Sequence, residues 1–520
     1  MCTGDFVGFL DHDDEIYQYA LFEVVKKLNE DPTLDILYSD EDKTNSEGDR
    51  FDPFFKPDWS PALLLSTNYM AHFLVYKKNL LQNNLLRSEF DGAQDYDLVL
   101  RLTEKTNKIG HISKPLYSWR QITGSTSTGV NAKSYASRAA HSALEQTLRR
   151  RKLKGEIREG QVSGSYHVKY DLIKEPKVSI IIPTKDKLSL LKKCIDSLEK
   201  TNYRNYEVII VDNISKEKDT LNYLNSVKHK VIKFDKKFNF SKINNFAAKQ
   251  ASGEYLLFLN NDTEIFESNW LREMVSQLID DNVGIVGPML LYGNGTIQHG
   301  GVMVGFEGKA GNCFIGLYPH QAGYFGLHNM VRNCASVTAA CMLVKRKIFD
   351  EVGGFDEKIP IAYGDVDLCL KILTANYDIV YTPYAKLFHH ESASRGTLSP
   401  TEDAVFFNKK WNDLLKKGDP YYNPNLSLLY IYQIKVNETY IPGTLVVPQP
   451  QPIPLYDRML ANDMIETKSL LLNQQINNFT FKPKISIVMP VFNTDPKWLQ
   501  AAIESVLEQL YQNWELCIVD

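Results

Sequence analysis

The chain has 520 residues, of which 43% are hydrophobic, so it is long enough for two or three domains with buried cores of ordinary size. Its 59 Lys and Arg nearly balance 63 Asp and Glu, and the net charge of -4 gives no basis for a nucleic-acid partner. Seven cysteines without CxxC spacing indicate reduced thiols, and no apolar stretch approaches the ~20 residues that span a bilayer. We therefore expect a cytoplasmic protein, at most peripheral at the inner face of the cytoplasmic membrane.

The chain opens with an apolar segment that ends in an acidic turn. Residues 3–16 read TGDFVGFLDHDDEI, and residues 252–265, SGEYLLFLNNDTEI, repeat this pattern of a strand followed by an acidic turn. A weaker repeat joins residues 93–98 (AQDYDL) to residues 363–368 (YGDVDL), and each starts a helical apolar pattern. The first 130 residues therefore carry features that return, in the same order, later in the chain.

A second repeat lies in the middle and at the end of the chain. Residues 176–212 and 483–520 each read as a strand, a loop, a helix and a second strand that ends on an Asp. Continuous apolar strands of this kind belong to parallel sheets with helices on both faces, and ligands bind at the carboxyl ends of such strands. The expected fold is therefore α/β, with a mostly parallel, Rossmann-like sheet.

These repeats divide the chain into one whole unit and two partial ones. We expect a complete domain over residues 176–430, preceded by the C-terminal part of a truncated domain (1–130) and followed by the truncated start of another (483–520). A linker with one amphipathic helix (131–175) and a Pro-rich linker (431–482) separate them. The simplest explanation is that the chain is a window cut from a longer tandem protein.

Two carboxylates of the middle unit follow buried strands. Asp212 ends one strand, and Asp262 follows another strand and the turn residues Asn260 and Asn261. Both should face one cleft, where such hard oxygen ligands suit Mg2+ or Mn2+ holding a diphosphate. Taken alone, the turn fits equally well as a set of helix-capping residues ahead of Trp270.

A family resemblance gives this pattern a specific meaning. The order of strand, Asp, strand, acidic triplet and Asp-rich helix start resembles the family 2 glycosyltransferases with the GT-A fold, in particular tandem-domain bacterial polysaccharide and rhamnosyltransferase-like enzymes. The resemblance covers residues 176 to about 430 and includes the phrases FNFSKINNFAA (238–248), GTIQHGGV (295–302), VTAACMLVKR (337–346), VGGFDE (352–357) and FHHESASRG (388–396). Several independent matches in the right order outweigh the capping interpretation.

The resemblance implies how the nucleotide would be bound. Asp212 would contact the base or ribose, with Thr184 and Asp186 beside it. Asn245 belongs to a donor-rich loop that would touch the nucleotide or its phosphates, together with Asn239, Lys242 and Asn244.

The resemblance also implies a divalent metal cofactor, Mn2+ or Mg2+, on the diphosphate. Asp262 stands at the last acid of the family's Asp-X-Asp motif, while Asn260 replaces the first acid with a neutral oxygen ligand, which puts metal dependence in some doubt. The family often places a metal-ligating His after a later strand, and His389 and His390 both match that position.

Asp365 resembles the family's general base, which removes a proton from the acceptor hydroxyl as that oxygen attacks the anomeric carbon. A carboxylate in a cleft can take up that proton, and a single carboxylate on the attacking side implies one displacement with inversion. The alternative for Asp365 and Asp367 is that they stabilise the dipole at a helix N-terminus.

The first 130 residues resemble the same family through LDHDDE (10–15), LYSDEDK (37–43), FFKPDWSP (54–61) and QDYDL (94–98). Asp11, Asp13 and Asp95 would be the site residues of this second, truncated domain. Relatives often carry a His where this chain has Ser118. We predict that the two end pieces make no second active site, because nothing in them corresponds to residues 213–251 of the middle unit.

The expected function is that of an inverting glycosyltransferase. It would move a sugar from a nucleotide-diphosphate sugar donor to a hydroxyl of a glycan or lipid-linked glycan acceptor in bacterial surface polysaccharide synthesis, with rhamnose, galactose or an N-acetylhexosamine as candidate sugars. Two alternatives are a catalytically silent carbohydrate-binding or scaffold protein on the same fold, and a nucleotidyltransferase. The latter would need a Gly-rich basic loop after the first strand, which Pro183-Thr184-Lys185-Asp186 does not provide.

Overall fold

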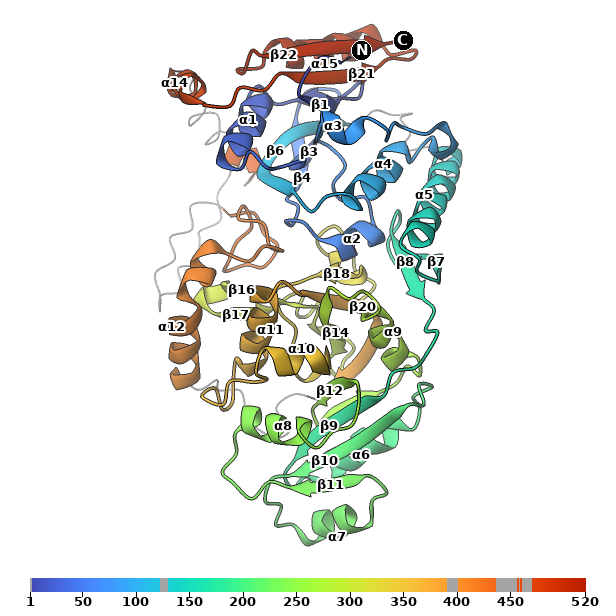
Figure 1. Cartoon of the computed structure of the whole chain (residues 1–520), viewed down its shortest axis with the longest axis vertical. Helices are drawn as coiled ribbons and strands as arrows, with labels where there is room; N and C mark the ends of the chain where they lie inside the picture. Colours follow the sequence, from blue (N-terminus) through green and yellow to red (C-terminus); the bar gives the residue numbers. More distant parts are fainter. Residues whose placement is uncertain (1, 122–129, 391–400, 436–455, 458, 461–469) are drawn as a thin grey trace. The chain divides into compact units, whose positions relative to one another are not determined.

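The computed structural model describes residues 2–121, 130–390, 401–435, 456–457, 459–460 and 470–520 (Figure 1). It divides the chain into two compact units, which we call unit 1 and unit 2. Unit 1 comprises Met1–Ser60, Thr67–Lys152 and Tyr422–Asp520, and unit 2 comprises Pro61–Ser66 and Leu153–Tyr421. Unit 2 thus contains nearly all of the predicted middle domain. No helix in the described part of the chain is both long and apolar enough to cross a bilayer.

Unit 2 is built on a sheet with the strand order β11-β10-β9-β12-β19-β14-β20-β13. The strands are β9 (Val178–Thr184), β10 (Tyr206–Asp212), β11 (Lys230–Lys233), β12 (Tyr255–Leu259), β13 (Thr263–Ile265), β14 (Val283–Leu291), β19 (Cys341–Lys345) and β20 (Asp378–His389). The first four strands in the sheet are parallel, and so is the pair β14 and β20, whereas β19 runs antiparallel to both of its neighbours. This mostly parallel sheet confirms the predicted α/β fold class.

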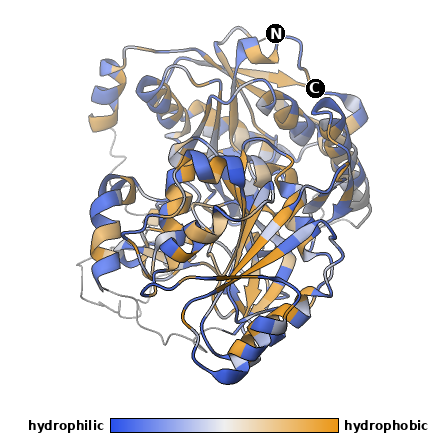
Figure 2. Cartoon of the chain, turned by 60° about the horizontal axis from the view of Figure 1, so that its bottom comes forward, coloured by the Kyte–Doolittle hydropathy of each residue, from blue (hydrophilic) through white to orange (hydrophobic). Residues whose placement is uncertain are grey.

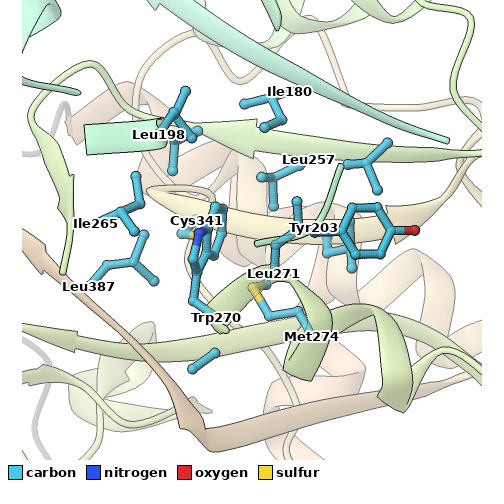
Figure 3. Close-up of a cluster of buried hydrophobic side chains, with 14 of the residues drawn as sticks. Ile180, Leu198, Tyr203, Leu257, Ile265, Trp270, Leu271, Met274, Cys341 and Leu387 are labelled. Carbon is cyan, nitrogen blue, oxygen red and sulfur yellow. The ribbon is translucent and has the colours of Figure 1, made fainter. Parts of the chain in front are cut away.

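Helices cover both faces of this sheet, as two successive residues of β12 illustrate. Leu257 packs in a buried cluster with Leu198 of α6 (Leu188–Leu198) and Trp270 of α9 (Trp270–Gln277) (Figure 3). The next residue, Phe258, points to the other face and meets Phe349 of α10 (Arg346–Glu351), with ring centroids 5.4 Å apart. The strands are accordingly hydrophobic along most of their length, while the helices carry both kinds of residue (Figure 2).

The other elements of unit 2 lie between and after these strands. They are α2 (Pro61–Ser66), the hairpin β7 (Gly155–Glu159) and β8 (Tyr166–Tyr170), α7 (Lys218–Ser226), α8 (Phe240–Ala248), β15 (Ile297–His299), β16 (Val302–Val304), β17 (Ala310–Asn312), β18 (Arg332–Asn333), α11 (Gly364–Thr374) and α12 (Thr401–Lys417). The β7–β8 hairpin occupies the end of the predicted 131–175 linker, for which the sequence indicated only a polar stretch.

Unit 1 repeats much of this architecture in a sheet with the order β2-β6-β3-β5-β1-β21-β22. Its strands are β1 (Phe6–Phe9), β2 (Glu15–Ile16), β3 (Ile36–Thr44), β4 (Arg50–Phe54), β5 (Leu74–Lys77), β6 (Ile109–Arg120), β21 (Ile485–Pro490) and β22 (Trp514–Val519). Its helices include α1 (Ala20–Glu30), α3 (Lys78–Leu81), α4 (Gln94–Thr103), α5 (Val130–Arg150), α14 (Leu470–Asn478) and α15 (Pro496–Leu507).

The two end pieces, which we predicted as separate partial domains, are joined in this sheet. β1 pairs in parallel with β21, so that Phe6 lies opposite Ile485. β22 is the outermost strand of the described sheet, whereas in unit 2 the equivalent strand β10 has β11 beside it. The predicted Pro-rich linker 431–482 lies mostly outside the described residues.

A half-buried glutamate makes the same contacts at the strand starts of both units. In unit 2, Glu207 accepts hydrogen bonds from Ser179 Oγ at 2.6 Å and from the Ser252 backbone N–H at 2.7 Å, which ties β9 and β10 to the start of β12. Burial alone would raise the pKa of Glu207, but these hydrogen bonds and Lys177 outweigh it and lower the pKa to about 2. In unit 1 the corresponding contacts are made by Glu515 with Ser486 and Thr3.

Candidate active site

Asp262 and His389 meet at the carboxyl end of β12. The turn that carries Asp262 leads into β13, which pairs antiparallel with the end of β20 so that Thr263 lies opposite His389. This register brings Asp262 Oδ1 to 3.2 Å from His389 Nε2. Both side chains are buried, and Asp262 Oδ1 accepts no hydrogen bond from the described residues.

The tautomer of His389 is set by Gln298 in β15. Gln298 Oε1 lies 2.6 Å from His389 Nδ1, and because a carboxamide oxygen can only accept, Nδ1 carries the hydrogen. In the tautomer with the hydrogen on Nδ1 the lone pair is on Nε2, which lies 3.3 Å from Asn260 Nδ2 and 3.2 Å from Asp262 Oδ1. The lone pair therefore faces an unpartnered carboxylate oxygen, an arrangement that suits a cation bound to both atoms.

These residues fit the expected divalent metal. Asp262, His389 and Asn260 offer carboxylate, imidazole and carboxamide donors at one point. Over the described ranges, no group of three His, Cys, Asp or Glu side chains is gathered as a metal site. Mg2+ in nucleotide enzymes is typically held by one or two protein carboxylates and completed by substrate phosphates and water, so a small donor set is the expected kind.

His390 does not join this group. Adjacent residues of a strand point to opposite faces, and His390 Nε2 lies 3.1 Å from Glu264 Oε2, which also pairs with Lys193 at 2.7 Å. The His390 backbone N–H donates to the Asp262 carbonyl at 2.9 Å, but of the two histidines that the sequence left open only His389 brings its side chain to the Asp262 carboxylate.

Asp365 reaches the same region from the start of α11. Its Oδ2 accepts a hydrogen bond from the Ala339 backbone N–H at 3.0 Å, and the carbonyl of the next residue, Ala340, accepts from the Asn260 N–H at 3.0 Å. Two consecutive residues thus contact both Asp365 and the turn that carries Asp262. Asp365 is half-buried, so a bound substrate can reach it.

Asp367, two residues further on, has a different environment. It is fully buried, and its Oδ1 lies 2.7 Å from Lys410 Nζ and accepts a hydrogen bond from Trp411 Nε1 at 2.8 Å. The exposure of the two carboxylates therefore favours Asp365 as the one that acts on substrate.

Thr184 and Asp212 lie opposite each other at the carboxyl ends of β9 and β10. Thr184 Oγ1 accepts a hydrogen bond from Asn261 Nδ2 at 3.0 Å, which links this strand end to the turn that carries Asp262. Asp212 Oδ1 accepts a hydrogen bond from the Ser215 backbone N–H at 3.0 Å, which fixes the orientation of the Asp212 carboxylate at the start of the loop after β10.

Asp186 joins the loops that follow β9 and β10. Its Oδ1 accepts hydrogen bonds from the backbone N–H groups of Lys216 and Glu217 at 2.6 and 2.8 Å. Desolvation raises the pKa of Asp186, but these two N–H groups outweigh it and lower the pKa. Asp186 therefore holds these two loops together beside Asp212, while its contact with the nucleotide stays a prediction.

Asn245, which we predicted to touch the nucleotide, serves a different purpose in the structure. Its carboxamide accepts from the Phe355 backbone N–H and donates to the Phe355 carbonyl, both at 2.9 Å. Asn239 likewise caps α8 through the Lys242 N–H and donates to the Glu357 carbonyl at 2.9 Å. Asn239 and Asn245 thus hold the loop after α10, because their amides match its open backbone groups, whereas Asn244 donates to the Phe240 carbonyl within α8.

The candidate residues of unit 1 have no histidine at the position that matches His389 of unit 2. Asp11 and Asp13 lie in the turn after β1, and Asp95 Oδ2 accepts a hydrogen bond from Asn68 Nδ2 at 2.8 Å. Ser118, which stands where relatives often have a His, donates its hydroxyl to Asp42. In unit 2, His389 lies opposite Thr263, whose counterpart in unit 1 is Asp14. Because Glu15 pairs with Ser118, the same antiparallel register extended by one residue puts Trp119 opposite Asp14. Trp119 therefore takes the place that His389 has in unit 2.

Two residues of the site escaped the sequence analysis as candidates. Gln298 stood within the phrase GTIQHGGV, and Asn261 stood between the two residues that we singled out. No local signal marked Gln298, because it lies among other polar residues, Thr296 and His299, and its role depends on its contact with His389.

Comparisons with known proteins agree with this geometry. Residues 179–353 and 486–520 match the family described as Glycosyl transferase family 2. The O-antigen biosynthesis protein RfbC of Myxococcus xanthus is 43% identical over 437 residues, which cover 82% of this chain and 34% of that protein. The uncharacterized protein y4gI of Sinorhizobium fredii is 41% identical over 446 residues, 82% of this chain and 49% of that protein.

The chain therefore spans between a third and a half of the length of these curated relatives. Among solved structures, a crystal structure of GalNAc-T7 with UDP, GalNAc and Mn2+ has a TM-score of 0.40 and 17% sequence identity, over 49% of this chain and 51% of that one.

Proposed function

Because the chain belongs to glycosyl transferase family 2, we propose that unit 2 transfers a sugar from a nucleoside-diphosphate donor to a hydroxyl of a growing glycan, with inversion at the anomeric carbon. The setting we propose is the synthesis of a bacterial surface polysaccharide, since the similar protein of Myxococcus xanthus is named for O-antigen biosynthesis. The acceptor is then a glycan or a lipid-linked glycan.

The observation that carries this proposal is that two consecutive residues, Ala339 and Ala340, connect Asp365 to the turn that carries Asp262. Ala339 contacts Asp365 and Ala340 contacts Asn260, so a base and a candidate diphosphate-binding turn lie on either side of one short segment. A donor whose diphosphate is held at the turn presents its anomeric carbon between the two. That is the placement needed for attack by an acceptor hydroxyl.

In the proposed reaction Asp365 accepts the proton of the acceptor hydroxyl as its oxygen bonds to the anomeric carbon. The bond between that carbon and the diphosphate oxygen breaks, and the diphosphate leaves with the electron pair. Because Asp365 acts as a base and not as a nucleophile, one displacement inverts the configuration.

Asp262, His389 and Asn260 would hold the divalent cation on the diphosphate, with Gln298 keeping His389 Nε2 directed at it. The bound cation, Mn2+ or Mg2+, supplies electrostatic stabilisation of the charge that develops on the leaving diphosphate. Asp212 and Thr184 would contact the nucleoside, at strand ends where α/β sheets bind ligands.

Two measurements test the proposal. Calorimetry with UDP and with dTDP, each in Mn2+ or in EDTA, should show binding that requires the metal. A panel of nucleotide sugars screened by thermal stabilisation then identifies the donor for turnover assays. Equal nucleotide binding in EDTA would contradict the metal role.

The role of Asp365 is tested separately. Asp365→Asn should leave donor binding nearly intact and lower turnover ~100-fold or more, as expected for loss of a general base. Asp367→Asn is the matched comparison, because that carboxylate is fully buried and bound by Lys410 and Trp411. Full activity in Asp365→Asn, with activity abolished in Asp367→Asn, would show that the wrong carboxylate was chosen.

A further inference from the structure

One face of α12 contacts the turn that presents Asp365. Asp403, Phe407, Lys410 and Trp411 follow one another at intervals of four, three and one residues, which places them on the same side of a helix. Each contacts a residue between 356 and 367, that is, the loop before α11 or its first turn.

Asp403 holds the backbone immediately before Asp365. Its Oδ2 accepts hydrogen bonds from the N–H groups of Ile361 and Ala362, both at 2.9 Å. The side chain is 3% exposed, so these charge-assisted bonds are shielded from water and are stronger than their surface equivalents. The two N–H groups precede Asp365 by four and three residues.

Phe407 supports the next residue of the same turn. Its ring, fully buried, stacks on Tyr363 with centroids 5.2 Å apart and an interplanar angle of 22°. Tyr363 has a φ of 62°, a left-handed conformation that costs a residue with a side chain roughly 1 kcal/mol or more. Such a conformation persists only where surrounding contacts favour it.

Lys410 and Trp411 hold the first turn of α11 beyond Asp365. Both contact Asp367 Oδ1, at 2.7 and 2.8 Å, and Lys410 also binds Asp356 Oδ2 at 2.8 Å. Residues on both sides of Asp365 in the sequence therefore contact α12: Ile361, Ala362 and Tyr363 precede it, and Asp367 follows it.

A different helix anchors the earlier part of the loop. The Phe240 N–H of α8 donates to the Pro360 carbonyl at 2.7 Å, and Ser241 Oγ donates to the Ile359 carbonyl at 2.6 Å. Loss of the Asp403 contacts would therefore free only residues 361 and 362, between the α8 anchor at Pro360 and Tyr363, which Phe407 still supports. A change at Asp403 should thus act locally.

We propose that α12 is a positioning element for the general base, and that Asp403 is the positioning residue through which it fixes the Asp365 carboxylate. This inference rests on the proposed function, in which Asp365 removes the acceptor proton. A general base must lie within hydrogen-bond reach of that proton, and a displacement of about 1 Å can cost ~100-fold in rate.

The first test compares three variants with the intact protein. Asp403→Ala should lower kcat ~10- to 100-fold while the Kd of the nucleotide-sugar donor changes less than ~2-fold. Asp403→Asn should keep most of the activity, because its carboxamide oxygen can accept both N–H groups. Asp413→Ala, on the exposed side of the same helix, is the control and should match the intact protein.

The second test asks whether Asp403 acts through Asp365. In the Asp365→Asn background, adding Asp403→Ala should cause no further loss of kcat, because the base that it positions is already absent. An equal loss in both backgrounds would overturn the proposal and would assign Asp403 to the stability of the unit. An unchanged kcat in a folded Asp403→Ala variant would also overturn it, while leaving the proposed function intact.

Should Asp403→Ala not fold, Phe407→Leu provides the same test, since it keeps most of the buried apolar volume and removes the stacking on Tyr363. Its kcat should fall with donor Kd unchanged, and a normal kcat would count against the proposal. Wild-type kcat in Asp365→Asn would instead overturn the role of Asp365 as the general base, and the positioning role of Asp403 with it.

Discussion

Gln298 Oε1 and His389 Nδ1 lie 2.6 Å apart, although 91 residues separate them in the chain. The contact joins β15 to the end of β20 and decides which ring nitrogen of His389 faces Asp262. A metal-ligating His commonly donates its second N–H to such a partner, which fixes both its tautomer and its ring orientation. Gln298 is thus a residue on which the affinity of the metal should depend.

We therefore predict that Gln298→Leu weakens Mn2+ binding ~10- to 100-fold, because neither the tautomer nor the ring orientation of His389 is then fixed. Gln298→Glu should retain binding, since a carboxylate also accepts from Nδ1. Titration of Mn2+ in the presence of UDP, followed by calorimetry, measures the change. Gln250→Leu, at an exposed position, is the matched control. Unchanged Mn2+ affinity in a folded Gln298→Leu variant would exclude this role.

Glu207 should make the stability of unit 2 depend on pH. Its pKa is lowered from 4.5 to about 2 in the folded state, so the stabilisation is fully present above about pH 4.5 and is lost as the pH falls towards 2. The loss should be about 2 to 3 kcal/mol, given the partial exposure of the side chain. Denaturant unfolding of Glu207→Gln should show a weaker pH dependence between pH 5 and about pH 3 than the unchanged protein. Glu254→Gln, an exposed residue at the same edge, should behave like the unchanged protein.

Asp262→Ala should abolish transfer, whereas Asp13→Ala should leave it unchanged. Asp262 faces His389, which Asn260 also contacts. Asp13 lies in a unit where Ser118 is bound by Asp42, and where no described strand flanks β22 as β11 flanks β10. Initial rates of the two variants at saturating donor give the comparison. A loss of transfer in a folded Asp13→Ala variant would show that unit 1 contributes to catalysis.

Trp270 should be a major contributor to the stability of unit 2. It is fully buried between α6 and the sheet, and its Nε1 donates to Thr201 Oγ1 at 2.9 Å (Figure 3). Trp270→Phe removes ring volume and leaves a buried hydroxyl without its donor, so we expect a loss of about 2 to 4 kcal/mol in unfolding free energy. Chemical denaturation measures it. A loss below about 1 kcal/mol would mean that the surrounding side chains close the cavity.

The amino-acid sequence by itself determined the elements and the general position of the site. Continuous apolar runs such as Val178–Ile182 indicated buried parallel strands, and the internal repeats indicated one whole unit and two partial ones of the same kind. Asp212 and Asp262 were found because polar residues that directly follow buried strands collect at one edge of a parallel sheet. These features depend on residues close together in the chain, where periodicity carries the information.

Partners that lie far apart in the chain were decided only by the tertiary structure. The pairing of β1 with β21 depends on register and edge complementarity between segments at opposite ends of the chain, which neither segment specifies alone. Asn245 and Gln298 have side chains of the same chemistry, yet one holds a loop and the other orients His389. A carboxamide bonds whichever group the fold brings to it, so its role follows from packing and not from its position in a motif.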